Sequence, residues 1–148
     1  MRSANEAAVS ERAVSEQAEP GNAVVEFIGV MTVIIIPALI LLIGLSTTTR
    51  AQLALDDAAR QSVRAYVRAD SGVQAQAQAR TAADLAWDTR GFVEPLAFGV
   101  SCTASPCLSP GASVEVTVSA DVGVPIIGSI SISASQSMLV DQYRVVRP

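Results

Sequence analysis

A nearly unbroken apolar run of 23 residues, from Ala23 to Leu45, constrains this chain more than any other feature. At about 1.5 Å of rise per residue, a helix of this length crosses the roughly 30 Å hydrocarbon core of a bilayer. The run is longer than the apolar region of a secretory signal peptide, and no Ala-x-Ala cleavage site follows it. The sequence therefore predicts a membrane-spanning helix that is retained as an anchor.

Glu26 is the one charged residue in this run. A carboxylate in a membrane helix costs about 2.5 to 3.5 kcal/mol at the centre of the bilayer and less near the interface. An acid in such a segment is therefore a candidate functional residue. The alternative is an interfacial residue whose side chain reaches water from an ordinary single-pass anchor.

The residues around Glu26 resemble the processing site of type IV prepilins. Gly21 precedes the apolar run, Glu26 is the fifth residue after it, and Phe27 follows. The Ala-Val-Val-Glu-Phe sequence is most similar to TadE-like minor pilins of the tight adherence (Flp) pilus system. The resemblance implies that a prepilin peptidase cuts the chain between Gly21 and Asn22. Beyond this segment, the resemblance extends only to the order of the elements.

In related pilins the fifth-position Glu is held to pair with the N-terminal amine of a neighbouring subunit. Cleavage here would create an amine on Asn22, about one helical turn before Glu26. The resemblance thus implies that Glu26 and Phe27 act in assembly with other pilin or pilus-assembly subunits. It also implies a minor pilin or an assembly factor, because the abundant major subunit of these systems is much shorter.

Composition argues against several classes of function. The 148 residues carry a net charge of −4 and no basic tract, whereas nucleic acids require a positive surface. The chain has no His and two Cys, which excludes His-based triads and zinc sites with four Cys or His ligands. The acidic pairs Asp56/Asp57 and Asp84/Asp88 are typical of helix surfaces. We therefore expect no enzyme activity, cofactor, metal or small-molecule substrate.

Cys102 and Cys107 are separated by four residues that include Pro106. An even pair of cysteines in a turn-rich loop outside the membrane favours a local disulfide. Two free thiols are the alternative.

The hydrophobic period changes once after the span. Apolar residues recur at helical spacing through residues 51–69 and 73–88, and then at every second residue in three predicted strands. The first helix is expected to present an apolar stripe of Leu55, Ala59, Val63, Tyr66 and Val67. The second is expected to be capped by Asp70 or Ser71, to end at Gly91 with a positive φ, and to bury a stripe that comprises Val73, Ala77, Ala82, Leu85 and Ala86. The predicted strands are 96–101, 113–120 and 129–140, with Val114, Val116 and Val118 on one face. Alternation of this kind is typical of an antiparallel sheet with one face on helices and the other towards water.

The predicted fold is α+β and pilin-like. A transmembrane helix extends into a helical stalk, and a small antiparallel β-sheet follows. The predicted parts are a polar leader (1–21), the transmembrane helix (22–46), extracytoplasmic helices (47–90) and the β domain (91–148).

The signals for membrane topology disagree. Arg12 is the base close before the span, whereas Arg50, Arg60 and Arg64 follow it within about 20 residues, which by the positive-inside rule places the C-terminal side in the cytoplasm. The cysteine pair and the prepilin-like motif favour the opposite orientation. We predict a single-pass protein of the cell membrane with an extracytoplasmic C-terminal domain.

Arg60, Arg64 and Arg68 form a basic ridge, which is either a solvated face or a contact for anionic lipid or a neighbouring subunit.

Two functions fit these observations: a TadE-like minor pilin that is processed after Gly21, and an unprocessed receptor or scaffold protein with an extracytoplasmic β domain.

If Gly21 is the cleavage residue, Gly21→Ala should leave expression normal but slow or abolish removal of the leader, because a side chain has little room at the cleaved bond. N-terminal sequencing of membrane-purified protein measures this. Maturation at the wild-type rate would remove the processing hypothesis.

Overall fold

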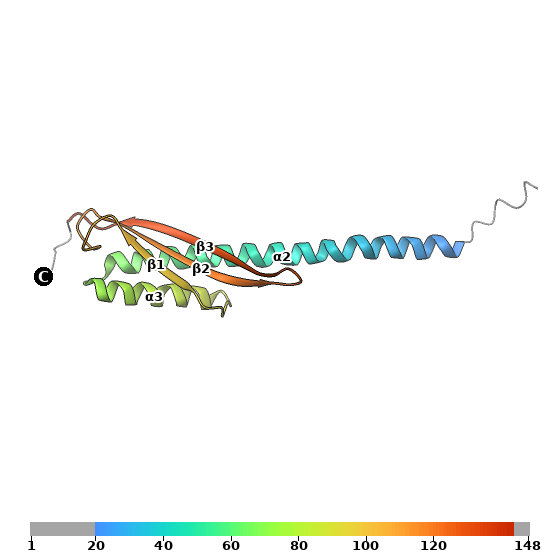
Figure 1. Ribbon diagram of the computed structural model, residues 1–148, viewed down its shortest axis with the longest axis horizontal. Helices are drawn as coiled ribbons and strands as arrows, with labels where there is room; N and C mark the ends of the chain where they lie inside the picture. Colours follow the sequence, from blue (N-terminus) through green and yellow to red (C-terminus); the bar gives the residue numbers. More distant parts are fainter. Residues whose placement is uncertain (1–19, 144–148) are drawn as a thin grey trace, which may run out of the picture. The chain divides into compact units, whose positions relative to one another are not determined.

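The computed structural model describes residues 20–143, with side chains from Ala23 onward. Its elements are α2 (Pro20–Arg68), α3 (Gly72–Thr89), β1 (Ala97–Cys102), β2 (Ser113–Val124) and β3 (Gly128–Leu139) (Figure 1). The chain divides into two compact units, Met1–Leu41 and Leu42–Pro148. The fold is α+β as predicted, with a long apolar N-terminal helix, a second helix and a three-stranded antiparallel sheet.

α2 is one continuous helix of 49 residues that includes the apolar run and the predicted helix after it. It begins at Pro20, two residues before the predicted start of the span at residue 22. Proline suits the first helical position, because an N–H there would have no partner within the helix and because its φ is already close to helical. The helix also continues through Pro37.

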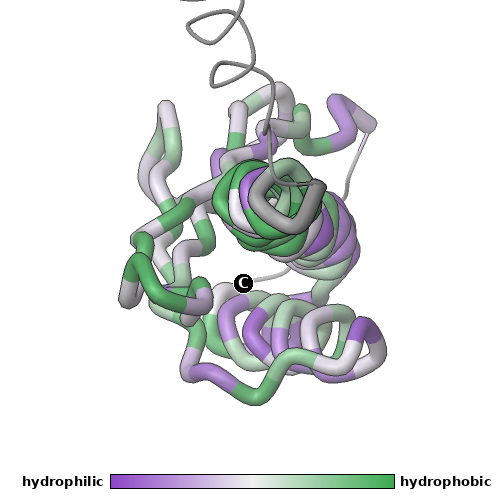
Figure 2. Tube along the Cα trace, turned by 90° about the vertical axis from the view of Figure 1, so that its right-hand side faces the viewer, coloured by the Kyte–Doolittle hydropathy of each residue, from purple (hydrophilic) through white to green (hydrophobic). Residues whose placement is uncertain are grey.

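The second unit packs two helical segments against one face of its sheet. α3 and the part of α2 from Leu42 onward lie on that face (Figures 1 and 2). Four of the five residues of the stripe predicted on α2 are at most 6% exposed, namely Leu55, Ala59, Val63 and Tyr66, and the fifth, Val67, is partly buried. Many of the other buried helical side chains are alanines: Ala51, Ala54, Ala58, Ala59, Ala75, Ala79, Ala83 and Ala86.

The buried face of α3 differs from the predicted one. Val73 and Leu85 are 84% and 65% exposed, and of the five residues predicted only Ala86 is buried. The helix instead buries Trp87 and a row of alanines at four-residue spacing, which admit closer packing than bulkier residues. Its ends agree with the prediction: the Ser71 side chain caps the first turn, and Gly91 after the last turn has a φ of 82°.

The sheet has the order β1-β2-β3, and both pairs are antiparallel. Val114, Val116 and Val118 share the buried face, as predicted. Alternation of buried and exposed residues continues to Val124, so β2 is four residues longer than predicted. The bounds of β1 and β3 each differ from the predictions by one residue at either end.

The alanine row of α3 gives a prediction for stability. Ala83→Leu should destabilise the second unit by about 1–3 kcal/mol, because Ala83 is 0% exposed and extra methylene groups overpack a filled core. Ala77→Leu is the matched control, since Ala77 lies on the same helix and is exposed. Denaturant unfolding can be followed by the fluorescence of Trp87, the single tryptophan of the chain, which is 1% exposed. Equal stability of the two variants would contradict the packing described.

Candidate functional site

The surface of α2 around Glu26 is apolar, and the described part of the chain does not cover it. Every side chain from position 23 to 39 is exposed, and the largest exposures include Val33 at 73% and Val25 at 69%. Hydrophobic residues predominate along this part of α2 in Figure 2. One helix near the N-terminus is thus long and apolar enough to cross a membrane, by length and composition.

Glu26 lies within this exposed apolar surface, next to Phe27, which is 63% exposed. Within the described residues, ion pairs join Arg80 to Asp84 and Arg90 to Asp57, and Glu26 takes part in neither. The described part of the chain therefore offers no counter-charge to this carboxylate. Its predicted role in assembly, like that of Phe27, stays a prediction.

Gly21 and Asn22 belong to the first turn of α2, so the peptide bond predicted to be cut is part of the helix. Asn22 and Glu26 are four residues apart on this helix, which places them on adjacent turns of one face. An amine created on Asn22 would therefore lie close to Glu26 along the axis. Cleavage itself stays a prediction.

Threonine hydroxyls near the end of the apolar run bond to the helix itself. Thr47, Thr48 and Thr49 donate to the carbonyl oxygens four residues earlier at 3.0, 2.9 and 2.8 Å. Such bonds satisfy a hydroxyl without water, as a helix in or near a bilayer requires. Arg50 comes next and is exposed, so it follows the apolar run at the position where a lipid headgroup region would begin.

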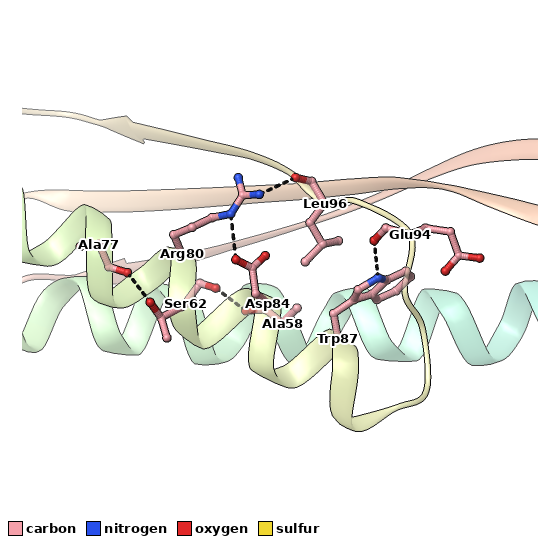
Figure 3. Close-up of polar contacts among 9 residues, drawn as sticks. Ala58, Ser62, Ala77, Arg80, Asp84, Trp87, Glu94 and Leu96 are labelled. Atoms are coloured by element: carbon pink, nitrogen blue, oxygen red, sulfur yellow. Dashed lines mark hydrogen bonds and ion pairs between the residues drawn. The ribbon is translucent and has the colours of Figure 1, made fainter.

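Side chains of α3 bind the backbone that leads into β1 (Figure 3). Arg80 forms an ion pair with Asp84 at 3.1 Å and donates to the Leu96 carbonyl at 3.0 Å. Trp87 Nε1 donates to the Glu94 carbonyl at 2.9 Å. These contacts fix the segment between α3 and β1 against α3. The hydrophobic periodicity of the sequence does not predict them, because they are polar contacts between a helix and an irregular segment.

Cys102 and Cys107 are joined in a disulfide with an S–S distance of 2.05 Å. The bridge lies at the end of β1, and the loop that it closes is held to β2 by the Thr103 N–H, which donates to the Ser113 carbonyl at 3.0 Å. The disulfide therefore adds a covalent link to a turn that backbone hydrogen bonds already fix.

The basic ridge of Arg60, Arg64 and Arg68 is exposed on α2 and lines an open groove that Ala82 of α3 also borders. Among the described residues none of the three arginines forms an ion pair. The ridge is thus available to water or to an anionic partner, and the structure favours neither interpretation.

No family model, curated protein or solved structure matches this chain. Within the described residues no three His, Cys, Asp or Glu side chains gather as metal ligands would. A function for the chain must therefore follow from its own residues, and the uncovered apolar surface with its one carboxylate is the strongest of its features.

The disulfide gives a prediction about the compartment. Cys102 and Cys107 should be oxidised to each other in native membranes, because the structure joins their sulfur atoms in a loop that backbone hydrogen bonds hold to β2. Maleimide labelling of the protein before and after reduction measures this: two labelled thiols should appear only after reduction. Labelling of both residues without reduction would contradict the bridge and also the extracytoplasmic location.

Proposed function

We propose that this chain is a TadE-like minor pilin or pilus assembly component, anchored in the membrane by α2 and processed by a prepilin peptidase after Gly21. The observation that carries the proposal is Glu26, a lone carboxylate in an uncovered apolar helix surface that has no counter-charge within the described residues. A helix that serves only as a membrane anchor gains no stability from this charge. A helix that associates with another helix can gain stability from it, because the carboxylate can pair with a positive group of the partner.

The chemistry of pairing follows from the low dielectric around the span. An unpaired carboxylate is costly there, and the same carboxylate beside an amine is much less so. Cleavage after Gly21 supplies such an amine on Asn22, either of the same chain or of a neighbouring helix. When the amine belongs to a neighbouring helix, the two charges meet only in one alignment of the helices, so that this intermolecular pair selects a register as well as a partner.

The proposed location is the cell membrane, with the second unit on the extracytoplasmic side or incorporated in a surface pilus. The Cys102–Cys107 disulfide supports this orientation, since disulfides persist in oxidising compartments. The partners would be the prepilin peptidase, the lipid bilayer and other pilin or pilus-assembly subunits. No nucleic acid and no small-molecule substrate belongs to this proposal.

A second candidate is an unprocessed single-pass receptor or scaffold protein. It is favoured by the position of Gly21 and Asn22 inside α2, because a protease must bind its substrate in an extended form and would have to unwind this turn. N-terminal sequencing separates the two candidates. A mature chain that begins at Asn22 supports the pilin component, and an intact leader supports the receptor or scaffold.

Glu26→Gln tests the pairing. The substitution should leave insertion and cleavage nearly intact, because removal of a charge makes the span more favourable in lipid. It should make the free energy of association with pilus partners less favourable by about 3–5 kcal/mol if the pair is desolvated, since the partner amine loses its counter-charge. Less of the protein should then co-purify with these partners. The measurement is recovery of the processed protein with its partners.

Glu115→Gln is the matched control, because it makes the same change at an exposed position of the second unit. It should leave recovery unchanged. Undiminished recovery of Glu26→Gln would show that the acid is an interfacial or cleavage-site feature and not an assembly device.

A further inference from the structure

We propose that the turn between β2 and β3, residues 125–127, is a second membrane contact, which inserts two isoleucines into the leaflet where the apolar run of α2 ends. This inference rests on the proposed function in one respect, namely that α2 spans a bilayer. It adds a lipid-binding site on the β domain.

The turn exposes large apolar side chains where hairpins ordinarily carry polar ones. Ile126 is 81% exposed and Ile127 is 63% exposed. Ile126 also has a φ of 72°, a conformation that strains a β-branched residue and that Gly or Asn adopts readily. Neither packing within the chain nor turn geometry therefore accounts for an isoleucine at this position.

The rest of the hairpin shows what its water-facing positions look like. Every outer-face position of β3 from residue 129 to 137 is an exposed serine: Ser129, Ser131, Ser133, Ser135 and Ser137. The exposed large apolar side chains of the hairpin are thus those of the tip and Leu139, which lies at the opposite end of β3 and is 67% exposed. From residue 122 to 140 the sequence contains no charged residue, so the tip can enter an apolar layer without carrying a charge into it.

Two contacts place the tip along α2. Gln52 donates to the Ser133 carbonyl at 3.2 Å, and a Cβ built on Gly44 would lie 3.2 Å from Cγ1 of Val124. From Ser133 towards its turn, the hairpin therefore runs beside α2 in the direction from Gln52 to Gly44. Figure 1 shows the hairpin extending along α2 in this way. Gly44 is buried, and its lack of a side chain lets the end of β2 approach the helix.

Gly44 lies within the apolar run, one residue before its end at Leu45. Gly44 precedes Arg50 by six residues, or about 9 Å along the helix axis. Its neighbours Leu42, Ile43 and Leu45 are between 54% and 62% exposed. The isoleucines of the turn follow Val124 and thus lie at the level of these exposed apolar residues or beyond it, on the lipid side of Arg50.

Lipid is the occupant that these observations favour. The exposed tip lies at the level of a helix surface that lipid covers under the proposed function. Two isoleucines and a proline are also too small an area for a stable protein interface, which buries about 800 Å² on each partner. With the tip inserted, the β domain would be held at the membrane surface at a second point, which limits its rotation about α2.

Site-directed fluorescence on the full-length protein tests the contact. The chain has two cysteines and they are joined, so a cysteine introduced by Ile126→Cys is the one free thiol for an environment-sensitive label. In vesicles of phosphatidylethanolamine and phosphatidylglycerol, this label should be quenched by spin-labelled lipid and protected from aqueous iodide. Ile127→Cys provides a second test of the same turn if Ile126→Cys does not fold.

Val73→Cys is the matched control and Val33→Cys is the reference for the span. Val73 is 84% exposed, close to the 81% of Ile126. It follows the end of α2 at Arg68, and this end lies about 36 Å from Gly44 along the helix axis. Its label should be quenched by iodide and not by spin-labelled lipid. The label at Val33, which is 73% exposed in the middle of the apolar run, should show the opposite behaviour.

The possible outcomes separate the two proposals. Iodide quenching at position 126 with lipid quenching at position 33 would overturn the second contact and leave the anchor intact. Iodide quenching at position 33 would overturn the anchor and the second contact together. Protection at position 126 from both quenchers would show that protein, such as a second copy, covers the tip, and would also overturn the lipid contact.

Discussion

A segment that crosses a bilayer has to satisfy its backbone hydrogen bonds within itself, and α2 is long and apolar enough to be such a segment. The helix runs without a break from Pro20 to Arg68, through Pro37, and its threonine hydroxyls bond to carbonyls one turn earlier. The same helix changes its surface along its length. Up to residue 39 every described side chain is exposed, whereas further on a narrow stripe around Leu55 and Val63 is buried. One element thus supplies both the exposed apolar segment and a wall of the folded unit.

The folded unit builds its core from small helical side chains and a valine-lined sheet face. Trp87 is the largest of its fully buried side chains, and Ser62 is buried with its hydroxyl bonded to the Ala58 carbonyl at 2.6 Å (Figure 3). A core of this kind depends on close approach of the backbones, because alanines bury little area each. The exposed Arg80 and the buried Trp87 both bond to the backbone before β1, and these contacts hold that segment against α3.

Local signals predicted most of the fold. The valine alternation of β2, the Ser71 cap and the positive φ of Gly91 each follow from one residue and its neighbours, and each was predicted from the sequence. The buried face of α3 was predicted wrongly, because alanines carry a weak hydrophobic signal and the bulkier Val73 and Leu85 dominate the pattern. The approach of the hairpin to α2 could not be predicted, since it depends on packing between distant segments. For the candidate site, the sequence identified Glu26 as unusual, but its partner would come from outside the described residues.

The course of α2 bears on the proposed orientation in the membrane. The positive-inside rule counts bases near the ends of a span, and Arg50 is the one that lies close to Leu45. Arg60 and Arg64 lie 15 and 19 residues after Leu45 on the continuous helix, or about 22 Å and 28 Å along its axis. They belong to the folded unit, and folded domains are translocated largely regardless of their charge. The charge bias against an extracytoplasmic second unit thus depends on Arg50 and on two arginines of the folded unit, whose charges have less influence there, whereas the disulfide supports the proposed extracytoplasmic side.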